Sequence, residues 1–224
     1  EARHHGFKSI TIDTNGYLFH DILEKITPDL LDFLSFSLDG ATRKTNDAIR
    51  GEGSYDAVLA GIKKARNRGF ACSMIYTVSD KNIHELSLMP DLVKDLGIDR
   101  FFIQVIGIRG KSRGKSQGKS GDKSVISESE KLQVDRNTWM TLIPSVAEQA
   151  ADLGITVTYP KVFLKNTETF ECAGLVAENY FIFPNGRVYR CPLCEDYPLH
   201  SFEIIGNELI SKEKRGIATS MVAG

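Results

Sequence analysis

The sequence contains no apolar run long enough to span a bilayer, and its N-terminus shows no signal-peptide pattern. It also has no excess of either charge, because its formal net charge at pH 7 is -1. A chain with so little net charge exerts no overall attraction on nucleic acid or on an anionic membrane. We therefore expect a cytoplasmic protein that binds neither nucleic acid nor membranes. Its 224 residues can form one substantial core, or one domain with a small appendage.

Cysteine is scarce, with four residues in the chain, yet three of them fall in residues 171–194, "ECAGLVAENYFIFPNGRVYRCPLC". Cytoplasmic thiols stay reduced, so clustered cysteines indicate metal ligands or catalysts. The Asn185–Gly186 pair favours a tight hairpin turn, which would carry Cys191 back towards Cys172. Cys191 and Cys194 form C-P-L-C, whose two-residue gap lets both sulfurs bind one metal centre. We predict a metal site made by Cys172, Cys191 and Cys194.

Thiolates alone do not distinguish an iron–sulfur cluster from zinc. A fourth ligand would come from beyond Gly224, from His200, from the substrate or from water. The alternative is that Cys172 is a small buried hydrophobe and that C-P-L-C is an isolated feature. Cys72 lies in an apolar run and is expected in the core.

Strand and helix patterns alternate along most of the chain, which predicts an α/β fold with a parallel sheet and right-handed crossovers. The expected strands cover residues 9–13, 32–40, 70–78, 100–108 and 155–160. The expected helices cover residues 17–26, 54–69, 82–97 and 136–154, with Asn82 and Glu85 spaced as a capping box. Ligands of such folds bind at the carboxyl ends of the strands, here "DTNG", "SLDG", "TVSDKN" and "IGIRG".

Residues 109–124, "RGKSRGKSQGKSGDKS", contain GKS triplets that suggest a phosphate-binding loop. That loop needs G-x-x-x-x-G-K-[ST], and no two glycines here have this separation. We therefore expect a flexible, basic connection rather than a nucleotide site.

The stretch "FLSFSLDGATRKTNDAIRGEGSYDAVLAGIKKARNRG", residues 33–69, resembles the middle of a radical SAM enzyme, and the resemblance extends over roughly residues 10–159. Its most specific pieces are S-x-D-G at residues 37–40, "IRG" at 49–51 and "TNG" at 14–16. The resemblance implies a partial (β/α) TIM-like barrel that binds S-adenosylmethionine (SAM) over a 4Fe–4S cluster. Such enzymes release a 5′-deoxyadenosyl radical that takes a hydrogen atom from the substrate.

The same resemblance implies a cofactor site at Ser37, Asp39, Arg50 and Asn15. Ser37 and Arg50 would meet the methionine carboxylate or the ribose, and a guanidinium pairs well with a carboxylate through its fork of donors. Alternatives from the residues themselves stay open: Asp39 with Gly40 makes a good turn pair, and Arg50 could be a solvated loop charge. No residue stands out as a catalytic acid or base.

The spacing C-x13-G-x4-C from Cys172 to Cys191 is similar to the opening of a SPASM domain, which binds auxiliary 4Fe–4S clusters. This implies a partial barrel over residues 1–160 and, over residues 161–224, the start of a SPASM or twitch domain built on a small β-hairpin extension. Enzymes of this type modify peptides or proteins. The implied partners are a peptide or protein substrate and a reductant such as a ferredoxin or flavodoxin.

One departure from the family is that its C-x-x-x-C-x-x-C and G-G-E motifs do not occur in the 224 residues. In family order both would precede Ile10, so we expect a fragment of a radical SAM enzyme that does not cleave SAM by itself. The alternative is a non-catalytic barrel remnant that carries a structural zinc site.

Overall fold

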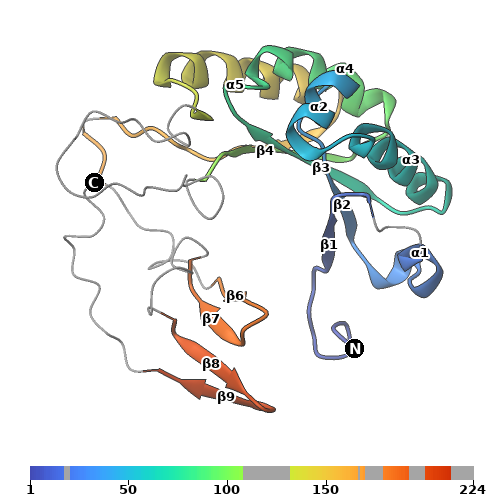
Figure 1. Cartoon of the computed structure of the whole chain (residues 1–224), viewed down its shortest axis with the longest axis vertical. Helices are drawn as coiled ribbons and strands as arrows, with labels where there is room; N and C mark the ends of the chain where they lie inside the picture. The colour runs from blue at the N-terminus through green and yellow to red at the C-terminus, as the bar shows by residue number, and fades with distance from the viewer. Residues whose placement is uncertain (18–20, 108–131, 166, 170–178, 192–199, 213–224) are drawn as a thin grey trace. The chain divides into compact units, whose positions relative to one another are not determined.

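The computed structural model describes residues 1–17, 21–107, 132–165, 167–169, 179–191 and 200–212 (Figure 1). The chain divides into two compact units, Glu1–Phe163 and Leu164–Gly224. The basic stretch at residues 109–124 and two of the predicted ligands, Cys172 and Cys194, lie outside the described residues.

The first unit is built on a five-stranded parallel sheet in the order β1-β2-β3-β4-β5. Its strands are β1 (Thr11–Thr14), β2 (Phe33–Ser37), β3 (Cys72–Val78), β4 (Arg100–Val105) and β5 (Thr156–Thr158). The predicted α/β fold with a parallel sheet is confirmed. The partial barrel stays a prediction.

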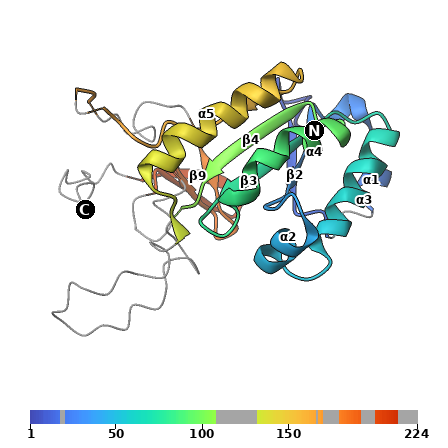
Figure 2. The same cartoon turned by 90° about the horizontal axis from the view of Figure 1, so that it is seen from above.

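The helices of the first unit follow the strands in alternation. They are α1 (Ile22–Lys25), α2 (Arg43–Arg50), α3 (Ser54–Asn67), α4 (Met89–Asp95) and α5 (Arg136–Asp152), with 3-10 helices η1 (Pro28–Leu30) and η2 (Ile83–Leu88). Helices α2 to α5 lie together on one side of the sheet (Figure 1, Figure 2). None of the described helices is both long enough and apolar enough to cross a membrane.

Two local predictions about helices were wrong. The segment "RKTNDAIR" lies between the predicted strand at 32–40 and the predicted helix at 54–69, where a loop and no helix was predicted, yet it forms α2. Asn82 was expected to cap a helix together with Glu85, but its side chain makes no capping hydrogen bond. The helix expected over residues 82–97 is instead η2 followed by α4, which begins beside Pro90.

The core lies between the sheet and the helices. Alternate residues of a strand point to opposite faces, and those directed at the helices are apolar and almost fully buried: Leu34, Phe36, Cys72, Met74, Tyr76, Phe101 and Ile103. They pack with residues of α3, α4 and α5 such as Val58, Ile62, Val93 and Ile143. The intervening strand residues occupy the other face of the sheet, where polar side chains are common.

The second unit contains an antiparallel sheet in the order β6-β7-β8-β9. Its strands are β6 (Phe181–Ile182), β7 (Arg187–Tyr189), β8 (Phe202–Ile205) and β9 (Glu208–Ser211). The predicted hairpin exists, and its turn places Gly186 at φ 80°. The extension was predicted as a hairpin, and it is larger because β8 and β9 continue the sheet.

Candidate functional site

Two glycines of the strand-end motifs are required by close packing. A Cβ on Gly40 would lie 2.5 Å from the backbone nitrogen of Asn46 in α2. Gly16 has a φ of 74°, and a Cβ there would lie 2.9 Å from Cγ2 of Val58 in α3. A side chain at either position would push a helix away from the carboxyl edge of the sheet. The glycines of "TNG" and S-x-D-G therefore allow α2 and α3 to approach this edge.

Asp39 is the centre of a hydrogen-bond network at the end of β2, and it is 5% exposed. The backbone N–H of Thr77 donates to Oδ1 of Asp39 at 2.7 Å. The backbone N–H of Asp39 donates to Oδ1 of Asn46 at 2.8 Å, and Asn46 in turn donates to Oγ of Ser54. These contacts tie β2 to β3, α2 and α3, so the position of Asp39 is fixed by four elements.

Arg50, the last residue of α2, reaches back to Asp39. Its Nε lies 2.7 Å from Oδ2 of Asp39, and its side chain is 23% exposed. The two groups form a close ion pair, although the direction of the Nε–H bond does not meet the geometry of a hydrogen bond. Nη1 and Nη2 of Arg50 form no ion pair within the part of the chain that the structure describes. Asp39 therefore pairs with Nε of the guanidinium, and Nη1 and Nη2 remain available as hydrogen-bond donors.

The remaining two predicted cofactor residues follow neighbouring strands. Ser37 is the half-buried last residue of β2. Asn15 is exposed and follows β1, whose last residue Thr14 pairs with Phe36 of β2. This register places Asn15 and Ser37 at adjacent strand ends. The structure brings Asp39 and Arg50 into contact and leaves Ser37 and Asn15 on the same edge.

Asn82 supports this edge in a way that the sequence pattern did not indicate. It is fully buried, and its Nδ2 donates to the backbone carbonyls of Asp39 and Thr77 at 3.0 and 2.9 Å. Its Oδ1 accepts from the backbone N–H of Ser79 at 2.7 Å. No local spacing predicts these contacts, because Asn82 and Asp39 are 43 residues apart.

Glu85 holds α2 from the other side. Its carboxylate accepts from the backbone N–H and the hydroxyl of Thr42 at 3.0 and 2.7 Å, and from the hydroxyl of Thr45 at 2.6 Å. Burial is the largest single influence on its pKa and raises it, but hydrogen bonds from Thr45, Thr42 and the backbone of Ala41 together outweigh burial and lower the pKa. Glu85 is therefore an ionised, structural anchor of the motif.

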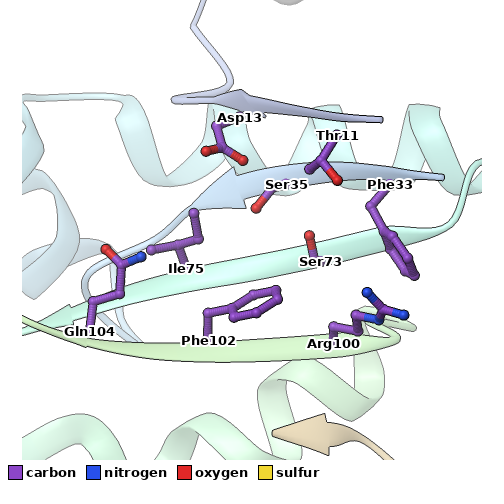
Figure 3. A pocket seen from close by; sticks show the side chains of 9 residues that line it. All are labelled: Thr11, Asp13, Phe33, Ser35, Ser73, Ile75, Arg100, Phe102 and Gln104. Atoms are coloured by element: carbon purple, nitrogen blue, oxygen red, sulfur yellow. The ribbon is translucent and has the colours of Figure 1, made fainter. Parts of the chain in front are cut away.

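The face of the sheet opposite the helices carries a hollow of about 210 Å³ (Figure 3). Its lining comes from β1 to β4 and mixes charged, hydroxyl and aromatic side chains: Thr11, Asp13, Phe33, Ser35, Ser73, Ile75, Arg100, Phe102 and Gln104. Sequence reasoning missed this site. The only signal for it was polar residues in alternation within otherwise apolar strands.

Of the predicted metal ligands, the structure describes Cys191, which is half-buried shortly after β7. The fourth-ligand candidate His200 has both ring nitrogens buried without a hydrogen bond among the described residues, and its Nε2 lies 3.8 Å from a carboxylate oxygen of Glu203. Within the described ranges, no three residues of the metal-binding types are grouped around a common point.

Cys72 is fully buried in β3, as expected. Burial raises the pKa of its thiol to about 11, so it is neutral and unsuited to binding a metal.

The chain is similar to several known proteins in sequence and in fold. Residues 1–93 match the radical SAM superfamily. The chain is 27% identical over 135 residues to a probable GTP 3',8-cyclase of Metallosphaera sedula, which covers 60% of this chain and 43% of that protein. It is 37% identical over 90 residues to the AdoMet-dependent heme synthase of Methanosarcina barkeri, which covers 39% of this chain and 26% of the synthase.

Among solved structures, the chain resembles SuiB of Streptococcus suis. The TM-score is 0.60 for SuiB bound to S-adenosylmethionine, with 14% identity over 90% of this chain and 44% of SuiB. It is 0.59 for SuiB bound to its precursor peptide SuiA, with 15% identity over 82% of this chain and 42% of SuiB. This likeness concerns the fold. The chain spans less than half the length of each of these relatives.

Proposed function

We propose that the chain has the function of a radical SAM enzyme of the SPASM or twitch type, which uses SAM and 4Fe–4S clusters to modify a peptide or protein. The match of residues 1–93 supports the superfamily. The likeness to SuiB, which has been solved with SAM and with a precursor peptide, supports this type of enzyme and substrate. The proposal includes a partial barrel, a cytoplasmic location and a reductant such as a ferredoxin or flavodoxin.

The observation that carries the proposal is the guanidinium of Arg50, whose Nε pairs with Asp39 while Nη1 and Nη2 form no ion pair among the described residues. Asp39 pairs with its Nε and is itself fixed by β3 and α2, so Nη1 and Nη2 are left available at the carboxyl edge of the sheet. Two parallel N–H donors fit the carboxylate of an amino-acid cofactor such as SAM. Ser37 would add a hydroxyl from β2, and Asn15 an amide from the end of β1. These residues therefore fit SAM.

In this mechanism the residues of the chain bind and orient. Arg50 holds the methionine carboxylate, Asp39 keeps the guanidinium from rotating, and Asn82 keeps the carbonyl of Asp39 in place. SAM, bound together with a reduced 4Fe–4S cluster, would supply the radical chemistry for hydrogen-atom abstraction from the substrate. Cys172, Cys191 and Cys194 are our proposed ligands for an auxiliary 4Fe–4S cluster, and no step is assigned to that cluster.

The experiment is a calorimetric titration of SAM into the chain and into two matched variants. Arg50→Lys keeps the charge beside Asp39 but removes the fork, so we expect SAM to bind at least about tenfold more weakly. Arg43→Lys makes the same change at an exposed residue of α2 that pairs with Asp56, and SAM binding should not change. Equal affinity of Arg50→Lys and the unmodified chain would contradict the proposal.

A further inference from the structure

A row of four polar residues crosses the open face of the parallel sheet. The strand register pairs Asp13 with Ser35, Ser35 with Ser73, and Ser73 with Arg100, so the row runs over β1, β2, β3 and β4. Figure 3 shows their side chains on the same side of the sheet, within the hollow. Core strands that only pack would carry apolar residues here, so this row needs an explanation.

Ser73 is an unusual member of the row. It is 1% exposed, and its Oγ is buried without a hydrogen-bond partner among the residues that the structure describes. A buried hydroxyl without a partner costs free energy, and such groups are uncommon in folded proteins. Since Ser73 lines the hollow, a bound group that accepts its hydroxyl proton would satisfy it.

Arg100 is the exposed member of the row, at the start of β4. Its guanidinium carbon lies 4.0 Å from the centre of the Phe33 ring, and among the described residues it forms no ion pair. The acidic neighbour Asp99 is engaged elsewhere, because it pairs with Arg66 at 2.8 Å and accepts from the N–H of Cys72. Asp32, beside Phe33, pairs with Arg3 at 2.6 Å. At the edge of the hollow, the guanidinium of Arg100 thus has no carboxylate partner among the described residues.

Among the described residues, the one carboxylate that lines the hollow lies at the far end of the row. Asp13 is on β1, three strands from Arg100, which corresponds to about 14 Å between backbones. The β4 end of the hollow therefore favours an anion. Phe33, Ile75 and Phe102 give the same end an apolar lining. The volume of about 210 Å³ lies below the roughly 300 Å³ at which drug-sized sites begin, so it suits one group of a larger molecule.

We propose that the β4 end of this hollow binds an oxyanion of the substrate, a carboxylate or a phosphate, joined to a flat or apolar group. The guanidinium of Arg100 binds the oxyanion, the hydroxyl of Ser73 donates to it, and Phe33 and Phe102 pack against its carbon part. This inference names the chemical class of the substrate. It rests on the proposed function, because only that function makes the bound ligand a substrate.

The test is a titration of two probes, inorganic pyrophosphate and glutarate, into the isotope-labelled chain, followed by NMR. We expect at least one probe to bind with a Kd on the order of 1 mM or tighter. Arg100→Gln should weaken binding about tenfold or more, and Ser73→Ala should weaken it several-fold. Arg68→Gln makes the same change at an exposed arginine that ends α3 and should leave binding unchanged. The spectrum of each variant verifies its fold.

Each outcome has one meaning. Binding of pyrophosphate alone supports a phosphate group, binding of glutarate alone supports a carboxylate, and binding of both supports the shared oxyanion chemistry. Absence of binding by both probes overturns the inference, as does binding that neither Arg100→Gln nor Ser73→Ala weakens. Anion binding without SAM binding would remove the proposed function and leave the anion site. SAM binding without anion binding would leave the proposed function and remove the anion site.

Discussion

Glu85 is a buried carboxylate that helps to position the proposed cofactor residue Arg50. Its three hydrogen bonds from Thr42 and Thr45 fix the first turn of α2, whose last residue is Arg50. Because α2 is polar and has little apolar surface to bury, these bonds replace the packing that usually holds a helix. The orientation of the guanidinium therefore depends on an anion at the opposite end of the helix.

Glu85→Gln should lower the free energy of unfolding by about 1–3 kcal/mol at pH 7, measured by urea denaturation, because the ionised acceptor is lost. The folded-state pKa of Glu85 lies below the ordinary value of 4.5. The stabilisation from its carboxylate is thus fully present above pH 4.5 and is lost as pH falls through the folded-state pKa. The gap between the two proteins should shrink at acidic pH. Glu148→Gln, at an exposed site on α5, serves as the control, and a gap that is constant with pH would refute the assignment.

At the scale of elements, the junction between β1 and α3 depends on the glycine of "TNG". Gly16 and Gly154 both have positive φ angles, 74° and 83°, but a Cβ on Gly154 would meet nothing within 4 Å. Replacing either by alanine costs about 1 kcal/mol or more for the left-handed backbone. Gly16→Ala adds the collision with Val58, so it should cost at least about 1 kcal/mol more than Gly154→Ala in thermal or urea unfolding. Equal losses would show that α3 does not pack on this turn.

Helices and strands were predictable from the sequence where a periodic pattern of apolar residues determined them. Apolar runs and helical stripes located β2, β3, α3 and α5 to within a few residues. The pattern failed for α2, because "RKTNDAIR" is held by contacts with Thr42 and Glu85 rather than by an apolar face. It failed again at Asn82, whose side chain bonds to a strand 43 residues away instead of capping its own helix.

The candidate site, like the elements, was predictable from the sequence only in part. Resemblance to a family pointed to Asp39 and Arg50, and the structure brings them into contact. The row from Asp13 to Arg100 was missed, because it exists only once the strands are in register. Which residues lie beside one another in a parallel sheet depends on long-range pairing that no local motif records.

At the scale of the whole molecule, the proposed function requires a metal centre of iron rather than zinc at the clustered cysteines. Anaerobic reconstitution with iron and sulfide should give a brown protein with iron and sulfide bound, and Cys191→Ala should reduce that uptake. Cys72→Ala should not, because the thiol of Cys72 is buried and its pKa is raised to about 11. One zinc per chain with no iron uptake would instead support a structural module.

The most direct test of the central claim is to map SAM binding on the chain by NMR, residue by residue. We expect SAM to shift the resonances of Asn15, Ser37 and Arg50, at the carboxyl edge of the parallel sheet, first and most strongly. Resonances that do not move at this edge while the protein is folded, or shifts confined to another surface, would contradict it.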